Sequence, residues 1–335
     1  MFRTWGDWTD CLPGFASLLQ LELEAARETL INRPLRIGIS TRSLFNLDEE
    51  HRVFEEQGVA AYCLYQRDRE NILLPKGTAF QVIQRILALN DDPRKPYVEV
   101  ILMSRNSPDL SLRAFNSINS YGLPIKLGSF TSGRPLSPYI PAWNIDLFLS
   151  NDASDVQAAV AADTAAAKLG MPPSEACALV DEDEVRIAFD GDAVLFSAES
   201  DLVYKEKGLE GFLQHEVENA MNPMLGGPFG EFLKKLSMLR TIHLNGRGVS
   251  KVRICLVTAR NAPAHARVVH TFRAWGTPAD EAHFVGPNSK APILKSMGAH
   301  IFFDDQEKHI LGAAAVVPAG HVPGPHTPDN PIIPA

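Results

Sequence analysis

Two carboxylates two residues apart follow a short apolar run in the second half of the sequence. The run RIAF leads directly into Asp190, Gly191 and Asp192. If this run is a strand of a parallel sheet, its carboxyl end is where ligands bind, and the glycine lets the backbone approach a ligand closely. An aspartate placed there could attack phosphorus as a nucleophile. Aspartate and glycine are also common in ordinary turns, so these three residues alone are weak evidence of a site.

Other apolar runs carry polar side chains to the same expected edge. Thr258 ends one run, Asp304 and Asp305 end another, and Lys290 precedes a predicted helix. A lysine and a threonine can bind phosphate oxygens, whereas clustered carboxylates repel one another unless a hard cation such as Mg²⁺ lies among them. These residues therefore predict a magnesium and phosphate site in the second half of the chain.

Some of these residues have alternative interpretations. Thr258 could cap the helix that follows it, and Lys295 lies one helical turn beyond Lys290. The place of Lys290 just before a helix N-terminus, which favours anions, makes it the preferred phosphate ligand. Arg260 could reach the substrate or form a salt bridge at the surface, and the sequence does not separate the two.

The two halves of the sequence repeat one order of elements. Residues 37–45 match residues 187–195, and residues 98–104 match residues 252–258. Near-continuous apolar runs alternate with amphipathic helices, which is typical of an α/β fold with parallel strands covered on both faces. We expect two Rossmann-like lobes from an internal duplication, although chance similarity between two α/β units could supply part of the match.

These patterns divide the chain into four parts. Residues 1–34 form an N-terminal extension with one helix, residues 35–170 and 180–317 form the two lobes, and residues 318–335 form a proline-rich tail without regular structure.

The first lobe lacks the acids and the lysine of the second. Its residues at the corresponding positions are Ser40, Thr41, Arg42, Ser104, Leu136, Ser150 and Asn151. A lobe so altered cannot hold the metal or the nucleophile in the same way, so we interpret it as a structural or substrate-recognition partner. Arg42 and Asn106 could touch the base or ribose of a nucleotide if the lobes face each other; helix capping and surface polarity explain them equally well.

Composition narrows the classes of function. The chain has 335 residues and a net charge of −8, which argues against a surface that binds nucleic acid. No apolar stretch is long enough to span a membrane, and the four cysteines form no metal-binding cluster. We expect a soluble protein of the cytoplasm with free thiols. The sequence does not decide whether the chain forms a homo-oligomer.

The segments RIAFDGDAVLFS, LVTAR and HIFFDDQ, with NSINSYGLP in the first lobe, resemble the cytosolic 5'-nucleotidase type I family of the haloacid dehalogenase superfamily. The resemblance covers about residues 35–317. It implies Mg²⁺-dependent hydrolysis of AMP or deoxynucleoside monophosphates to a nucleoside and phosphate.

The resemblance also implies a role for each matched residue. Asp190 would attack the 5'-phosphate and bind Mg²⁺. Asp192 would protonate the leaving oxygen and then act as the base, and its backbone carbonyl would ligate the metal. Thr258 and Lys290 would hold the phosphoryl group. Asp305, or else Asp304, would complete the metal shell.

Two other functions compete with this one. A phosphatase or phosphotransferase acting on another small phosphate ester would share every motif. A non-catalytic nucleotide-binding protein is a further alternative, but such a protein gains little from clustered carboxylates without a metal.

Overall fold

The computed structural model describes residues 13–174 and 183–323. Its strands form one ten-stranded sheet in the order β3-β2-β1-β4-β5-β10-β9-β6-β7-β8. The strands are β1 (Leu35–Ser40), β2 (Val98–Ser104), β3 (Leu127–Phe130), β4 (Leu147–Ser150), β5 (Ala165–Leu169), β6 (Val185–Phe189), β7 (Val252–Thr258), β8 (Glu281–Phe284), β9 (Ile301–Asp304) and β10 (Ala319–His321). The α/β class and the parallel strands expected from the sequence are confirmed.

The sheet has two halves with the same strand order. Strands β1 to β5 and β6 to β10 are arranged alike, and the registers match: Ile37 pairs with Leu147 in the first half, as Ile187 pairs with Ile301 in the second. The two halves meet where β5 pairs with β10, and this pairing is antiparallel, whereas the other strand pairs in the described residues are parallel. The strands of the two halves therefore run in opposite directions.

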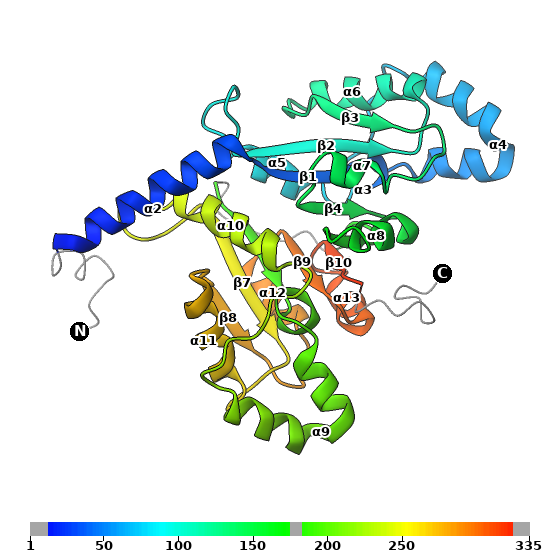
Figure 1. Ribbon diagram of the computed structural model, residues 1–335. Coiled ribbons are helices and arrows are strands. Elements are labelled where there is room, and N and C mark those ends of the chain that lie inside the picture. The colour runs from blue at the N-terminus through cyan, green and yellow to red at the C-terminus, as the bar shows by residue number, and fades with distance from the viewer. Residues whose placement is uncertain (1–12, 175–182, 324–335) are drawn as a thin grey trace.

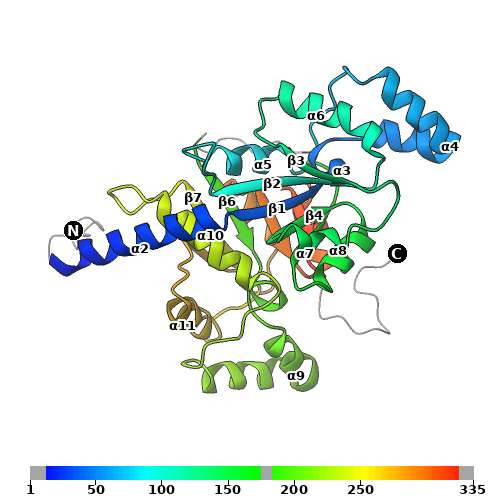
Figure 2. The same cartoon turned by 45° about the horizontal axis from the view of Figure 1, so that its top comes forward.

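This reversal decides where ligands can bind. In a parallel sheet, binding sites form at the carboxyl ends of the strands. Because the halves run in opposite directions, their carboxyl ends lie at opposite edges of the sheet. Accordingly, helices α4 and α9, each of which follows the first strand of its half, lie at separate ends of the molecule (Figure 1, Figure 2).

Helices cover both faces of the sheet. They are α2 (Pro13–Asn32), α3 (Thr41–Leu44), α4 (Asp48–Asp68), α5 (Phe80–Leu87), α6 (Ser111–Ser120), α7 (Tyr139–Ala142), α8 (Ala153–Val160), α9 (Glu199–Glu218), α10 (Gly230–Ile242), α11 (His265–Trp275), α12 (Ala291–Met297) and α13 (Glu307–Ala313). On one face a single apolar core runs through both halves, from Ile37 and Ile83 to Phe232 and Phe303. The other face has a separate core in each half. The two expected lobes are thus joined by one sheet and one shared core.

A glycine bends the long helix at the edge of each half. Gly58 in α4 has φ 80° and Gly208 in α9 has φ 67°, both in the left-handed region that glycine adopts without steric strain. Each helix therefore consists of two segments that meet at an angle.

The ends of the chain differ partly from expectation. The predicted N-terminal helix is present as α2, and its Leu30 is fully buried in the shared core. The tail assignment is wrong at its start, because Ala319–His321 form β10 and complete the sheet; the rest of the tail, residues 324–335, lies outside the described residues. Cys63 and Cys255 are free thiols, and the other two cysteines lie outside the described residues.

Among the described residues, no helix combines the length and the apolar character needed to cross a membrane.

A buried histidine makes the stability of this fold depend on pH. His300 is 6% exposed, and its Nδ1 accepts a hydrogen bond of 2.9 Å from the backbone N–H of Arg186. Burial, together with the charges of Arg85 and Arg186, lowers the pKa of His300 to about 4. A protonated Nδ1 could not accept this bond.

Since the folded pKa of His300 lies below its unfolded value, its contribution to stability is full above pH ~6.5 and is lost as the pH falls toward 4. His300→Asn can keep an acceptor at this place without titrating. Between pH 7 and pH 4.5 the wild type should lose about 2 to 3 kcal/mol of unfolding free energy more than the variant, measured by urea unfolding. An equal loss in both proteins would contradict this assignment.

Candidate active site

Three carboxylates converge at the carboxyl edge of the second half. Asp190 follows β6, Asp304 ends the neighbouring parallel strand β9, and Asp305 comes directly after it. One carboxylate oxygen from each lies within 4.8 Å of the others. The structure thus brings together three of the four acids that the sequence analysis placed at this edge, while the carboxylate of Asp192 pairs with Arg260.

Lys290 lies between two of these acids. Its Nζ is 2.7 Å from Asp190 Oδ1 and 2.7 Å from Asp304 Oδ2, and the side chain is buried. Burial alone would lower the pKa of Lys290, but the two carboxylates outweigh it and raise the pKa above its ordinary value. Lys290 therefore supplies a fixed positive charge beside Asp190.

Asp304 and Asp305 have different surroundings. Asp304 is fully buried; besides Lys290, it accepts a 2.8 Å bond from the N–H of Gln306 and lies 3.1 Å from Nδ1 of His309. Burial raises its pKa, but His309 and Lys290 outweigh this and lower it. Asp305, by contrast, has a buried Oδ1 that has no hydrogen-bond partner among the residues that the structure describes. Since a buried carboxylate oxygen is costly to leave unsatisfied, Asp305 Oδ1 is the oxygen best suited to a cation.

Two of the acids hold protons more tightly than usual. Burial raises the pKa of Asp190 to about 7; Lys290 opposes this shift and Asp304 adds to it. Burial, followed by the charges of Asp190 and Asp304, raises the pKa of Asp305 to about 8. A divalent cation among them would favour the ionised forms, so the set fits a hard metal with oxygen ligands.

Thr258 lies against the turn that carries Asp190. It ends β7 and is almost fully buried. A Cβ added to Gly191 would come within 3.4 Å of the Thr258 hydroxyl, so the turn and this hydroxyl approach closely. The Thr258 hydroxyl also accepts a 3.3 Å bond from the N–H of Arg260. It is available to donate its proton to a phosphate oxygen near Asp190.

Asp192 has a partner that the sequence analysis did not identify. Nε of Arg260 is 2.8 Å from Asp192 Oδ2, and its Nη2 is 2.7 Å from Asp192 Oδ1, so the guanidinium binds both carboxylate oxygens. The other side of the guanidinium binds Glu216, which is buried and paired also with Arg267 at 3.1 Å. Arg260 is 3% exposed, so the surface salt bridge considered for it is wrong. Glu216 of α9 thus meets Arg260 in the loop that follows β7.

Sequence reasoning missed Glu216 and His309. Glu216 lies on α9, and His309 lies on α13 after β9. Neither belongs to a short spacing pattern with the acids. The sequence shows Glu216 only as one acid in the segment between Asp192 and Thr258. An acid in such a segment could equally be exposed to solvent.

Arg42 and Asn106 lie elsewhere. They line a cavity at the carboxyl edge of the first half, at the opposite edge of the sheet from Asp190. These two residues could touch the substrate of the acids only if the lobes faced each other. The antiparallel pairing of β5 with β10 turns the two edges apart instead.

A parallel half-sheet with a lysine, a hydroxyl and three carboxylates at its carboxyl edge defines an α/β protein with a candidate metal and phosphate site. The family model described as 5'-nucleotidase matches residues 27–328. The human protein cytosolic 5'-nucleotidase 1B is 36% identical over 290 residues, which cover 83% of this chain and 47% of that protein. The chain belongs to the 5'-nucleotidase family, as the motifs suggested, and it spans about half the length of this curated relative.

Proposed function

We propose that this protein is a magnesium-dependent phosphatase that hydrolyses nucleoside 5'-monophosphates to a nucleoside and phosphate. The observation that carries the proposal is the placement of Lys290 and Asp305 around Asp190. Lys290 provides a buried cation beside the nucleophile, and Asp305 provides a buried oxygen without a partner. The nucleotide substrate rests on the family and on the name of the human relative.

The residues fit a bound Mg²⁺. Asp190 and Asp305 would hold it, together with the backbone carbonyl of Asp192, and Asp304 would support the site through Lys290. When bound, such an ion neutralises phosphate charge and polarises the phosphoryl oxygens.

The side chains divide the chemistry between them. A carboxylate oxygen of Asp190 forms a bond to phosphorus while the bond from phosphorus to the 5'-oxygen breaks, and Asp192 gives that oxygen a proton. Water then attacks the phosphorus of the aspartyl phosphate, Asp192 takes the proton, and Asp190 is released. Lys290 and Thr258 bind the phosphoryl oxygens throughout and stabilise their developing charge.

Phosphate release from a panel of nucleoside 5'-monophosphates, 3'-monophosphates and sugar phosphates, with Mg²⁺ and with EDTA, tests this proposal. We expect release from the 5'-monophosphates only, and only with Mg²⁺. If phosphate is released only from other esters, the proposed mechanism still holds but the protein is not a nucleotidase. No release from any ester would favour a non-catalytic nucleotide-binding protein.

The ion pair of Asp192 with Arg260 carries a separate prediction. Because Arg260 binds both oxygens of Asp192, the carboxylate must turn from it before carrying a proton to the leaving group. Arg260→Lys keeps the charge but loses the two-point contact, so Asp192 would be misoriented. We expect kcat to fall by about 10²-fold, with a much smaller change in KM.

Arg113 provides a matched control, because it is equally buried and pairs with Glu50 at 2.8 Å in the first half. Arg113→Lys should lower thermal stability and leave kcat unchanged. If both variants lose kcat equally, Arg260 has no special role in orienting Asp192.

We also propose that the two halves arose by duplication of a haloacid-dehalogenase-type lobe, with residues 35–170 as the half that lost its acids. The shared strand order, the matching registers and the glycine bends at Gly58 and Gly208 support this origin. The name of the human relative supports a cytosolic location.

A further inference from the structure

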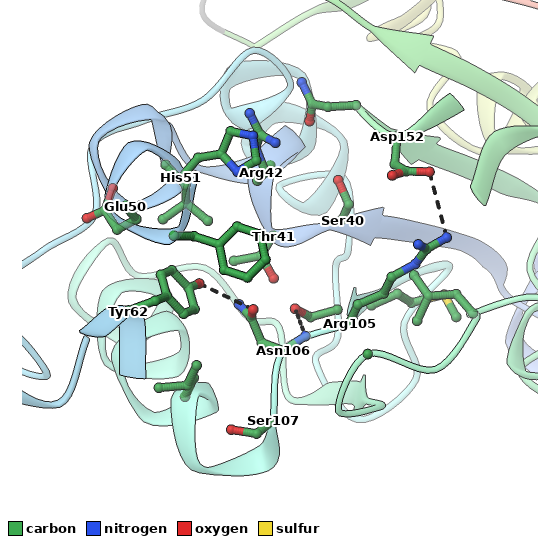
Figure 3. Close-up of a pocket in the computed structure, with 18 of the residues that line it drawn as sticks. Ser40, Thr41, Arg42, Glu50, His51, Tyr62, Arg105, Asn106, Ser107 and Asp152 are labelled. Carbon is green, nitrogen blue, oxygen red and sulfur yellow. Dashed lines mark hydrogen bonds and ion pairs between the residues drawn. The ribbon is translucent and has the colours of Figure 1, made fainter. Parts of the chain in front are cut away.

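A cavity of about 690 Å³ opens at the carboxyl edge of the first half. Its size is in the range of sites for small molecules and cofactors. Figure 3 shows His51 and Tyr62 on one side of it and Arg105 and Asp152 on the other. The antiparallel joining of the two half-sheets places this cavity at the edge opposite Asp190, so its residues are not part of the catalytic site.

The cavity is the counterpart of the catalytic site by position. Ser40 ends β1 where Asp190 follows β6, Ser104 ends β2 where Thr258 ends β7, and Ser150 ends β4 where Asp304 ends β9. The matching registers of the two half-sheets make these positions equivalent in space, not only in sequence.

The replaced residues change what the site can bind. Where the catalytic half has carboxylates, this half has the neutral side chains of Ser40, Ser150 and Asn151, which do not repel an anion. The Ser40 hydroxyl donates to Ser43 Oγ at 2.9 Å, so it has to turn from Ser43 to contact a phosphate. Without those carboxylates, the residues at these positions offer no oxygen cluster for a divalent cation. A phosphate could therefore bind here without a metal.

The charges around the cavity favour an anion near one rim. Three acids line the cavity, and each faces an arginine. Glu50 pairs with Arg113 at 2.8 Å, whereas Asp155 and Asp152 both face Arg105, with an Nε–Oδ1 distance of 3.1 Å and an Nη2–Oδ1 distance of 3.7 Å. Arg42 is left at the rim with a side chain that is 43% exposed and only a long contact of 3.9 Å to Asp48. Thr41, beside it, has a buried hydroxyl without a hydrogen-bond partner.

The other wall suits a flat ring. Phe54 packs on His51 with ring centroids 6.2 Å apart and on Tyr62 at 5.9 Å. The Tyr62 hydroxyl is 3.2 Å from Oδ1 of Asn106, which fixes a polar edge next to the aromatic group (Figure 3). Aromatic side chains stack on bases, and an amide can bind a base edge.

We propose that this cavity is a second binding site of the chain, for a nucleoside monophosphate held without metal. The phosphate contacts Ser40, Ser104 and Arg42, and the base lies against the wall formed by His51, Phe54 and Tyr62. We assign binding and no reaction to this site, because Ser40 stands where the catalytic half has Asp190.

Equilibrium dialysis of the full chain carrying Asp190→Asn, with labelled adenosine 5'-monophosphate in EDTA, tests this proposal. We expect one molecule bound per chain. Ser104→Ala and Arg42→Ala, each added to this protein, should weaken this binding by about tenfold. Thr258→Ala, the matched change in the catalytic half, should leave it unchanged.

Three other results would overturn the proposal. One is the absence of metal-free binding, and another is its loss in Thr258→Ala but not in Ser104→Ala. The third is binding of adenosine as tightly as adenosine 5'-monophosphate, which would show that the site does not recognise the phosphate. In the chain with Asp190 intact, Ser104→Ala should still release phosphate at the wild-type maximal rate, so failure of the catalytic proposal is distinguishable from failure of this one.

Discussion

Replacing Asp190 by asparagine is expected to lower phosphate release by about 10⁴-fold or more, because the amide cannot form the bond to phosphorus. The fold should survive this change. Burial raises the pKa of Asp190 to about 7, so the ionised carboxylate is unfavourable in the folded chain. A group whose folded pKa is raised in this way lowers stability as the pH rises through that value.

The Asp190→Asn protein should therefore unfold at the same temperature as the wild type, or higher, at pH 8 without metal. Steady-state phosphate release and thermal unfolding of the same preparation check both parts. A well-folded variant that retains about a tenth of the wild-type rate would rule out Asp190 as the nucleophile.

Replacing Lys290 by methionine has the second largest expected effect. The change removes the cation that lies 2.7 Å from both Asp190 and Asp304. The rate should fall by about 10² to 10³-fold, because a donor to the phosphoryl oxygens is lost. The folded state should also lose about 3 to 5 kcal/mol at neutral pH, since two buried carboxylates no longer have their partner.

The sign of the pH dependence separates this explanation from simple loss of packing. Lys290 helps to lower the pKa of Asp304, so its removal makes protonation of that carboxyl easier in the folded state. The stability deficit of Lys290→Met should therefore shrink as the pH falls toward 5, in unfolding experiments without metal. Lys295→Met, on the same helix but exposed, should keep both activity and stability. A deficit that does not change with pH would contradict the electrostatic explanation.

The sequence predicted the acids and the lysine well because parallel strands carry their carboxyl ends to one edge. Asp190 and Asp304 follow strands that pair directly, so two distant positions in the sequence become neighbours without any loop having to be predicted. The buried partner of Asp192 could not be found in this way. Glu216 near the end of α9 meets Arg260 in the loop after β7, and no periodic pattern in the sequence records that contact.

The sequence also does not show that the strands of the two halves run in opposite directions. Their junction consists of the short segments AAAKL and AGH, which carry no pattern that distinguishes parallel from antiparallel pairing. The second of them lies in a stretch rich in proline, which favoured an irregular tail. Because one pairing sets the orientation of a whole half, the sequence could not decide whether Arg42 and Asn106 lie near the acids.

The antiparallel pairing of β5 with β10 has a consequence for how the chain can change over evolution. Two copies of a lobe that faced each other would share one substrate, and a substitution in either would alter the same reaction. Here the carboxyl edges of the two halves lie at opposite edges of one sheet, which shares a common core. Substitutions at one rim can therefore accumulate without altering catalysis at the other, provided that the core between them is kept.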